Sequence, residues 1–181
     1  MHRKALDALM AVSRIGVLGA GQMGAGIAQV ASCSGYSVTM VDIDENAVER
    51  GMDSIRSSLQ RIVSKGRMEL KDSQAAMELI TRSTNRSDLS ECDLIVEAIP
   101  EILQLKLDTF SELDSICRRD SILATNTSSI SIDAIAKATN RPDRVIGMHF
   151  MNPVPIMKLV EIINGSETLS EVTDEVISVA E

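Results

Sequence analysis

One histidine and one glutamate in the C-terminal part of the sequence carry the groups best suited to proton transfer. His149 ends an apolar run, and a loop stiffened by Pro153 and Pro155 follows it. A second apolar run, 159–163, contains Glu161 as its one acid. A carboxylate inside an apolar strand is costly to bury without a partner, and His149 is the nearest group that can pair with it. A histidine held by a carboxylate is a ready general acid and base.

A glycine-rich turn in the N-terminal part has the spacing of a phosphate-binding loop. The apolar run 15–18 precedes Gly19, Gly21 and Gly24, and apolar residues at helical spacing follow. In a dinucleotide site the first glycine makes the tight turn, the second lets the backbone approach the pyrophosphate, and the third allows close packing of helix and strand. The N–H groups at the start of the helix would hold the phosphates. An ordinary glycine turn is the alternative interpretation.

An acidic residue follows the next apolar run at the distance expected for a ribose ligand. Residues 37–41 predict a second strand, and Asp42 comes directly after it. Asp44 and Glu45 are also acidic, and no arginine stands immediately beside them. A 2′-phosphate would be repelled here, so the sequence favours NAD as cofactor over NADP.

The composition excludes several classes of protein. The chain has 181 residues, a net charge of −8 and an isoelectric point near 4.8. It shows no basic patch with interleaved aromatic residues, so we expect no nucleic-acid partner. It has no apolar run long enough to span a membrane, so we expect no membrane partner.

The cysteines and the N-terminal residues bear on the compartment. Cys33, Cys92 and Cys117 are scattered and odd in number, which indicates a reducing compartment and no metal site. We expect an intracellular, cytoplasmic protein, with the peroxisome and the mitochondrion left open. Residues 1–13 are interpreted as an N-terminal extension that is too short and mixed to be a targeting peptide.

Strands and helices alternate through the remainder, 14–181, and predict one α/β domain. The predicted strands are 14–19, 37–42, 79–84, 93–98, 121–125, 144–149 and 158–163. The predicted helices are 22–35, 45–65, 70–78, 103–117, 131–139 and 169–181. Apolar strands joined by short connections indicate a doubly wound, mostly parallel, Rossmann-like sheet covered on both faces. The stretch 45–78 predicts an inserted antiparallel helical pair, which either stands out to meet a ligand or serves as a packed cover.

Two loops are expected at the edge of the sheet where ligands bind in such folds. One carries Glu101 and leads to Lys106, and the other carries Asn126, Ser128 and Ser129. Each has an ordinary structural alternative. For Glu101 it is interaction with a helix dipole, for Lys106 a solvated helix face, and for the other three capping and turn formation.

Four motifs together resemble the L-3-hydroxyacyl-CoA dehydrogenase family, over residues 14–181. They are Gly-Ala-Gly-Gln-Met-Gly, Val-Glu-Ala-Ile-Pro-Glu, Thr-Asn-Thr-Ser-Ser and His-Phe-Met-Asn-Pro-Val-Pro-Ile-Met-Lys-Leu-Val-Glu. Met151 replaces the family's usual phenylalanine. The resemblance implies NAD-dependent oxidation of a 3-hydroxyacyl-CoA to the 3-ketoacyl-CoA, a reaction of fatty-acid metabolism and β-oxidation.

The resemblance also implies roles for individual residues. His149 would take the hydroxyl proton, Glu161 would orient it, and Ser128 would hydrogen-bond the substrate oxygen. The residues implied to contact the cofactor are Gly19, Gly21, Gly24, Asp42, Glu101, Lys106 and Asn152. Ser58 and Lys65, on the inserted helical pair, match positions that contact coenzyme A.

The family pattern continues beyond residue 181 into an all-helical second domain. That domain supplies much of the acyl pocket and the dimer interface, so the resemblance implies a truncated chain that lacks it and a homodimer in the complete protein. Two rival hypotheses remain: a module that binds NAD without turnover, and a related hydroxyacid dehydrogenase of the gulonate type.

Overall fold

The computed structural model describes residues 12–181, and most of the interpreted extension lies outside them. The seven strands are β1 (Arg14–Leu18), β2 (Ser37–Val41), β3 (Ile80–Ser83), β4 (Leu94–Glu97), β5 (Ile122–Thr125), β6 (Val145–Phe150) and β7 (Val160–Asn164). The helices are α2 (Gln22–Cys33), α3 (Glu45–Ser64), α4 (Leu70–Glu78), α5 (Leu103–Ile116), α6 (Ile132–Ala136) and α7 (Ser170–Ala180), with short 3₁₀ turns at Arg86–Leu89 and Pro142–Arg144.

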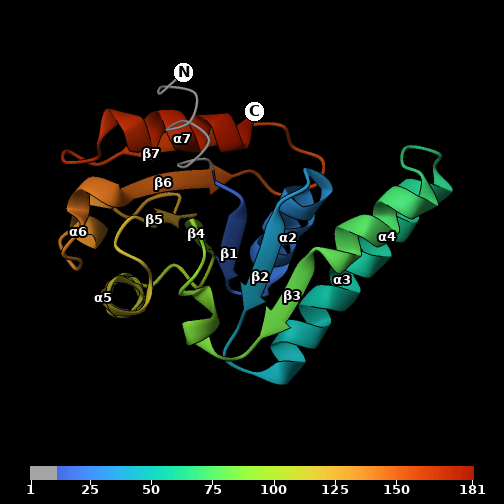
Figure 1. Cartoon of the computed structure of the whole chain (residues 1–181), viewed down its shortest axis with the longest axis horizontal. Coiled ribbons are helices and arrows are strands. Elements are labelled where there is room, and N and C mark those ends of the chain that lie inside the picture. The colour runs from blue at the N-terminus through green and yellow to red at the C-terminus, as the bar shows by residue number, and fades with distance from the viewer. Residues whose placement is uncertain (1–11) are drawn as a thin grey trace, which may run out of the picture.

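The strands form one sheet in the order β3-β2-β1-β4-β5-β6-β7 (Figure 1). Neighbouring strands are parallel except that β7 runs antiparallel to β6 at the edge. The order reverses between β1 and β4, and the crevice outside the carboxyl ends of the strands at such a switch point is where ligands bind. The predicted doubly wound, mostly parallel sheet is therefore confirmed.

Apolar side chains alternate between two cores, one on each face of the sheet. Ile15 and Val17 of β1 join the core that α2, α3 and α7 cover, whereas Leu18 joins the core under α5 and α6. Residues of β4 and β6 alternate in the same way. This alternation explains why the strands are continuous apolar runs in the sequence, because a parallel sheet is covered on both faces.

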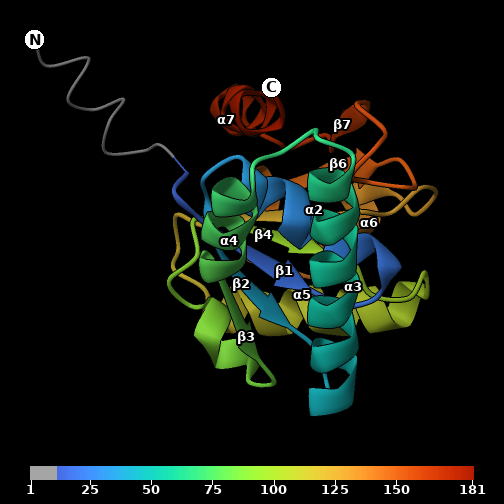
Figure 2. The ribbon, with the colours of Figure 1, turned by 90° about the vertical axis from the view of Figure 1, so that its right-hand side faces the viewer.

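The inserted helical pair is a packed cover that continues past the edge of the sheet (Figures 1 and 2). The side chain of Asp44 caps α3 by accepting a hydrogen bond from the Ala47 N–H at 2.8 Å. Residues on one face of α3 then enter the core, among them Val48 and Leu59. Gly66 has a φ of 66°, the left-handed conformation that lets the chain leave α3 and turn back into α4.

The predicted boundaries hold within three residues, most elements are slightly shorter than predicted, and the largest difference is at the end of α6. Helix α6 ends at Ala136 rather than near 139, and the Thr139 hydroxyl bonds the Ala136 carbonyl where the chain turns away. Strand β7 begins at Val160 because the proline-containing loop extends to Leu159.

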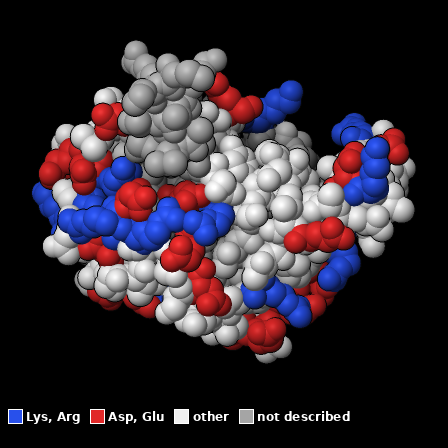
Figure 3. Space-filling model, in the orientation of Figure 1, with Lys and Arg blue, Asp and Glu red and all other residues white. Residues whose placement is uncertain are grey.

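On the face in Figure 3, basic and acidic side chains lie interspersed. No helix in the described part of the chain is long and apolar enough to cross a membrane.

Candidate active site

The glycine turn after β1 is built for close approach of backbone to backbone. Gly19 has a φ of 109°, and a Cβ there would lie 2.6 Å from the Ala98 carbonyl oxygen. A Cβ on Gly24 would lie 1.8 Å from the Gly19 carbonyl oxygen. At Gly21 a Cβ would meet nothing within 4 Å, and no side chain among the described residues caps α2. A ligand can therefore approach the backbone at Gly21, and the uncapped N–H groups at the start of α2 are suited to hold a pyrophosphate.

Asp42 lies beside this turn at the carboxyl end of β2. Its Oδ2 accepts a hydrogen bond from the Ala20 N–H at 2.6 Å, and its Oδ1 accepts one from the Ile43 N–H at 2.6 Å. The side chain is partly exposed. An ionised carboxylate can accept about four hydrogen bonds, so Asp42 retains capacity for the hydroxyls of a ribose.

His149 and Glu161 face each other across the antiparallel pair of β6 and β7. The two residues are directly opposite in register, and His149 Nδ1 lies 2.8 Å from Glu161 Oε2. Glu161 is half-exposed rather than buried, because β7 is an edge strand, so burial is not what selects its partner. A carboxylate only accepts hydrogen bonds, so Nδ1 carries the proton and Nε2 of the neutral ring is the free acceptor.

Ser128 lines the same hollow as this pair. The hollow has a volume of about 320 Å³ and is formed by the turn after β5, the start of α6, and residues of β6 and β7. Nearby, the Asn126 side chain accepts a hydrogen bond from the Phe150 N–H at 2.8 Å, which fixes the turn against the strand that carries His149. Asn126 therefore does not cap a helix; that position belongs to Ser131.

Lys106 is not a solvated lysine. It is 1% exposed, and its ammonium lies 2.6 Å from Glu97 Oε1 and 3.3 Å from Glu101 Oε2. The expectation of a solvated face failed because α5 turns Lys106 inward together with Thr109 and Phe110. Lys106 thus lies beneath the edge where ligands would bind rather than on its surface.

Glu101 reaches from the start of α5 to the turn after β5. Its carboxylate accepts hydrogen bonds from the Thr127 hydroxyl, from the Ser128 N–H at 3.1 Å and from the Ser129 hydroxyl at 3.3 Å. Partial burial acts to raise the pKa of Glu101, but the Thr127 hydroxyl and the Lys106 ammonium outweigh it, so the pKa is below its ordinary value. These bonds, not a helix dipole, account for the position of the side chain.

A second hollow, of about 440 Å³, brings together Ser58, Lys65 and Asn152. Arg61 and Arg67 line it as well, and neither was anticipated from the sequence. The spacing of Ser58, Arg61 and Lys65 at the end of α3 could have indicated Arg61, because residues three and four apart share one helix face. Arg67 follows the glycine turn after α3, outside the helix, and this spacing does not indicate it. Such a set of cationic groups is suited to phosphate oxygens.

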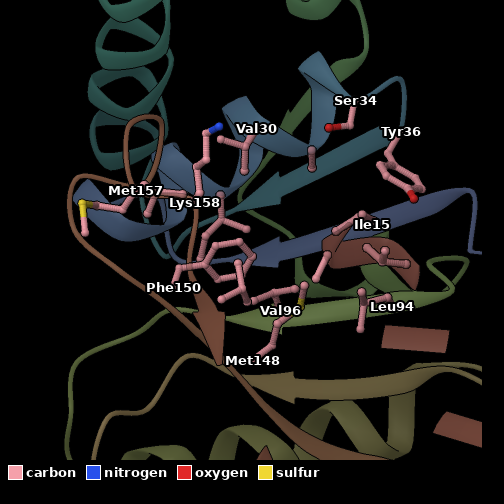
Figure 4. A pocket seen from close by; sticks show the side chains of 16 residues that line it. Ile15, Val30, Ser34, Tyr36, Leu94, Val96, Met148, Phe150, Met157 and Lys158 are labelled. Atoms are coloured by element: carbon pink, nitrogen blue, oxygen red, sulfur yellow. The ribbon is translucent and has the colours of Figure 1, made fainter. Parts of the chain in front are cut away.

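A third hollow, of about 180 Å³, is apolar and lies between α2, the sheet and α7 (Figure 4). Phe150, Met148 and Val96 line its floor, with Lys158 and Tyr36 among the remaining lining residues. None of the residues predicted to act on a ligand lines this hollow. Within residues 12–181, no group of three histidine, cysteine or acidic side chains is placed to hold a metal ion.

Comparison with known proteins places this chain among dehydrogenases. The family model described as "3-hydroxyacyl-CoA dehydrogenase, NAD binding domain" matches residues 14–181. A probable 3-hydroxybutyryl-CoA dehydrogenase of Bacillus subtilis is 44% identical over 172 residues, which cover 95% of this chain and 60% of that protein. A 3-hydroxyadipyl-CoA dehydrogenase of Escherichia coli is 40% identical over 164 residues, covering 91% of this chain and 34% of that protein.

A solved structure of a dehydrogenase is also similar to this chain. The crystal structure of (S)-3-hydroxybutyryl-CoA dehydrogenase from Ralstonia eutropha is similar to this chain with a TM-score of 0.92 and 41% identity. The match covers 94% of this chain and 60% of the Ralstonia chain. This chain thus spans about 60% of the length of the Bacillus and Ralstonia relatives.

Proposed function

Because this chain belongs to the 3-hydroxyacyl-CoA dehydrogenase family and matches its NAD-binding domain, we propose that it serves NAD-dependent oxidation of a 3-hydroxyacyl-CoA. The observation that carries the proposal is the shared hollow of His149, Glu161 and Ser128 in a domain whose glycine turn fits a dinucleotide. NAD, when bound, supplies the acceptor for a hydride. We propose residues 14–181 as the NAD-binding domain.

His149 acts as the base in the oxidation direction. Its Nδ1 proton is held by Glu161, so Nε2 accepts the proton of the 3-hydroxyl group. Glu161 fixes the ring orientation and stabilises the imidazolium that forms. Ser128, exposed in the same hollow, donates a hydrogen bond to the substrate oxygen.

The hollow beside α3 takes the coenzyme A end of the substrate. Ser58, Lys65 and Asn152 line it, and Arg61 and Arg67 add positive charge. Asn152 belongs to the loop that follows β6, the strand of His149. This loop therefore connects the reacting histidine to the hollow proposed for the phosphate groups of coenzyme A. This arrangement supports an acyl-CoA over a small sugar acid such as L-gulonate, the substrate of the rival class.

The complete active protein is proposed to include a helical part and to be a homodimer, as the family resemblance implies. Exposed apolar side chains on the loop after His149, at Ile156, Met157 and Leu159, are suited to burial against further protein. An intracellular, reducing location is also proposed, either the cytoplasm or, as alternatives, the peroxisome or the mitochondrion; the three cysteines, which are free thiols, support a reducing compartment.

We expect the chain to bind NADH at least about tenfold more tightly than NADPH, because Asp42 would repel a 2′-phosphate. Asp42→Ala should narrow this preference, because it removes both the repulsion of the 2′-phosphate and the acceptor for the ribose hydroxyls. Titration of both cofactors by fluorescence measures it. Asp120→Ala is the matched control, since Asp120 pairs with Arg118 just before β5, at the amino ends of the strands, and should leave the ratio unchanged. Equal affinities in the unsubstituted chain would refute the role of Asp42.

Lys65→Glu should weaken binding of acetoacetyl-CoA by about tenfold or more, because a carboxylate would replace a cation facing phosphate oxygens. Arg56→Glu makes the same charge change on α3 but outside this hollow, where Arg56 pairs with Asp53. It should change the affinity less than twofold. Calorimetric titration measures both. Equal losses in the two variants would mean that only overall charge matters, and the site beside α3 would be wrong.

A further inference from the structure

A fully buried ion pair lies directly beneath the proposed active site. Glu97 ends β4, Lys106 lies in the first turn of α5, and their side chains are 0% and 1% exposed. Burial of two charges carries a desolvation penalty that can exceed their attraction, so such a pair is weak evidence for a stabilising role. What the pair does is better judged from the groups that it contacts.

Every donor of the Lys106 ammonium is directed at a group of the protein. Glu97 Oε1 lies at 2.6 Å, Glu101 Oε2 at 3.3 Å and the Ile99 carbonyl oxygen at 3.4 Å. An ammonium has three N–H donors and no acceptor. Since the side chain is also closed off from solvent, Lys106 acts on a bound molecule through Glu101 rather than by contact.

Glu97 is fixed by more buried hydrogen bonds than Glu101 is. Its Oε1 also accepts a hydrogen bond from the Ile99 N–H at 2.7 Å, and its Oε2 accepts one from the Thr125 hydroxyl at 2.7 Å. Glu101, by contrast, is more than a third exposed. One oxygen of Glu101 faces Lys106 and the other holds the turn that contains Ser128.

We propose that Glu97 is a positioning residue, which holds Lys106 so that its ammonium orients Glu101 against the turn that presents Ser128. This role rests on the proposed function, since it assumes that Ser128 and Glu101 belong to the active site. The role of Lys106 changes accordingly from lining the cofactor site to positioning Glu101.

The double substitution Glu97→Gln/Lys106→Met removes both buried charges and keeps the shape of both side chains. The amide introduced at position 97 still offers an oxygen to the Ile99 N–H. The Thr125 hydroxyl, which donates to Glu97 Oε2, can instead accept from the amide NH₂ group, so both groups keep a partner at position 97. Asp114→Asn is the matched control. Asp114 pairs with buried Arg141 at the other end of α5, 2.7 Å away, and this second pair does not line the hollows of the site.

Two properties of the 181-residue chain are measured: hydrogen exchange of the Ser128 amide by NMR, and affinity for NADH. In the double variant we expect hydrogen exchange at the Ser128 amide to accelerate at least about tenfold, because the Glu101 carboxylate no longer holds that N–H in place. We expect NADH binding to weaken about tenfold for the same reason. Asp114→Asn should leave both within twofold. If the double variant does not fold, Glu97→Asp, which retracts the carboxylate by one methylene, should show the same changes at smaller size.

Unchanged Ser128 exchange in the folded variants would overturn the positioning role, whether or not NADH binds. Equal acceleration in Asp114→Asn would also overturn it, since the effect would then be general loosening of α5. Failure of the unsubstituted chain to bind NADH would refute the proposed function instead. Faster Ser128 exchange in the double variant would still support the positioning role in that case.

Discussion

His149→Ala should lower the rate of NADH formation from a 3-hydroxyacyl-CoA by about 10²–10⁴-fold, the usual contribution of a general acid or base. The loss follows from removing the nitrogen that accepts the hydroxyl proton, while the glycine turn and Asp42 remain. NADH affinity should therefore change less than twofold. The rate is measured in a chimaera in which residues 14–181 replace the matching part of the Ralstonia eutropha enzyme.

Glu161→Gln serves as the companion variant. It keeps a hydrogen-bond acceptor for Nδ1 but removes the charge that stabilises the imidazolium, so its loss should be smaller than that of His149→Ala. A rate within a few-fold of the unsubstituted chimaera for His149→Ala would show that another group takes the proton. A larger loss for Glu161→Gln than for His149→Ala would reverse the two roles.

Gly24→Ala and Gly21→Ala should fail in different ways, although both lie in one turn. A methyl group at Gly24 meets the Gly19 carbonyl oxygen at 1.8 Å, so the backbone must shift. We expect the free energy of unfolding to fall by about 3 kcal/mol or more, as in overpacked sites. A methyl group at Gly21 meets open space and an extended φ/ψ that alanine adopts. There the free energy of unfolding should change by no more than about 1 kcal/mol.

NADH affinity separates the two glycines further. Gly21→Ala should weaken NADH binding about tenfold or more, because the methyl group occupies the approach of the pyrophosphate. Chemical denaturation gives the unfolding free energies, and fluorescence titration gives the affinities. Unchanged NADH binding in Gly21→Ala would mean that the pyrophosphate does not lie on this turn.

Local pattern was sufficient to predict the sheet, its helices and the pairing of His149 with Glu161. Both residues lie in apolar strands that follow each other along the chain, and the antiparallel register of these strands places them opposite each other. The sequence argument for this pairing assumed that Glu161 is buried, and this assumption was wrong, since the edge position of β7 leaves Glu161 half-exposed. Exposure depends on which strand ends the sheet, and no single segment specifies that.

Residues that depend on how distant elements pack could not be predicted. The partner of Glu97 is Lys106, and their contact is decided by the angle at which α5 packs on the sheet. The charged pattern around Lys106 is equally compatible with a solvated face. Arg61 and Arg67 border a hollow only because the loop at Asn152 returns to α3 from a strand far along the chain.

The most direct test of the proposed function is substrate-dependent NADH formation by the same chimaera, once it is shown to bind NADH. Absorbance is followed with NAD and either 3-hydroxybutyryl-CoA or L-gulonate. We predict NADH formation with the acyl-CoA, at least about 10²-fold faster than with L-gulonate, and its loss in His149→Ala. No NADH formation with the acyl-CoA, or faster formation with L-gulonate, would contradict the proposed function.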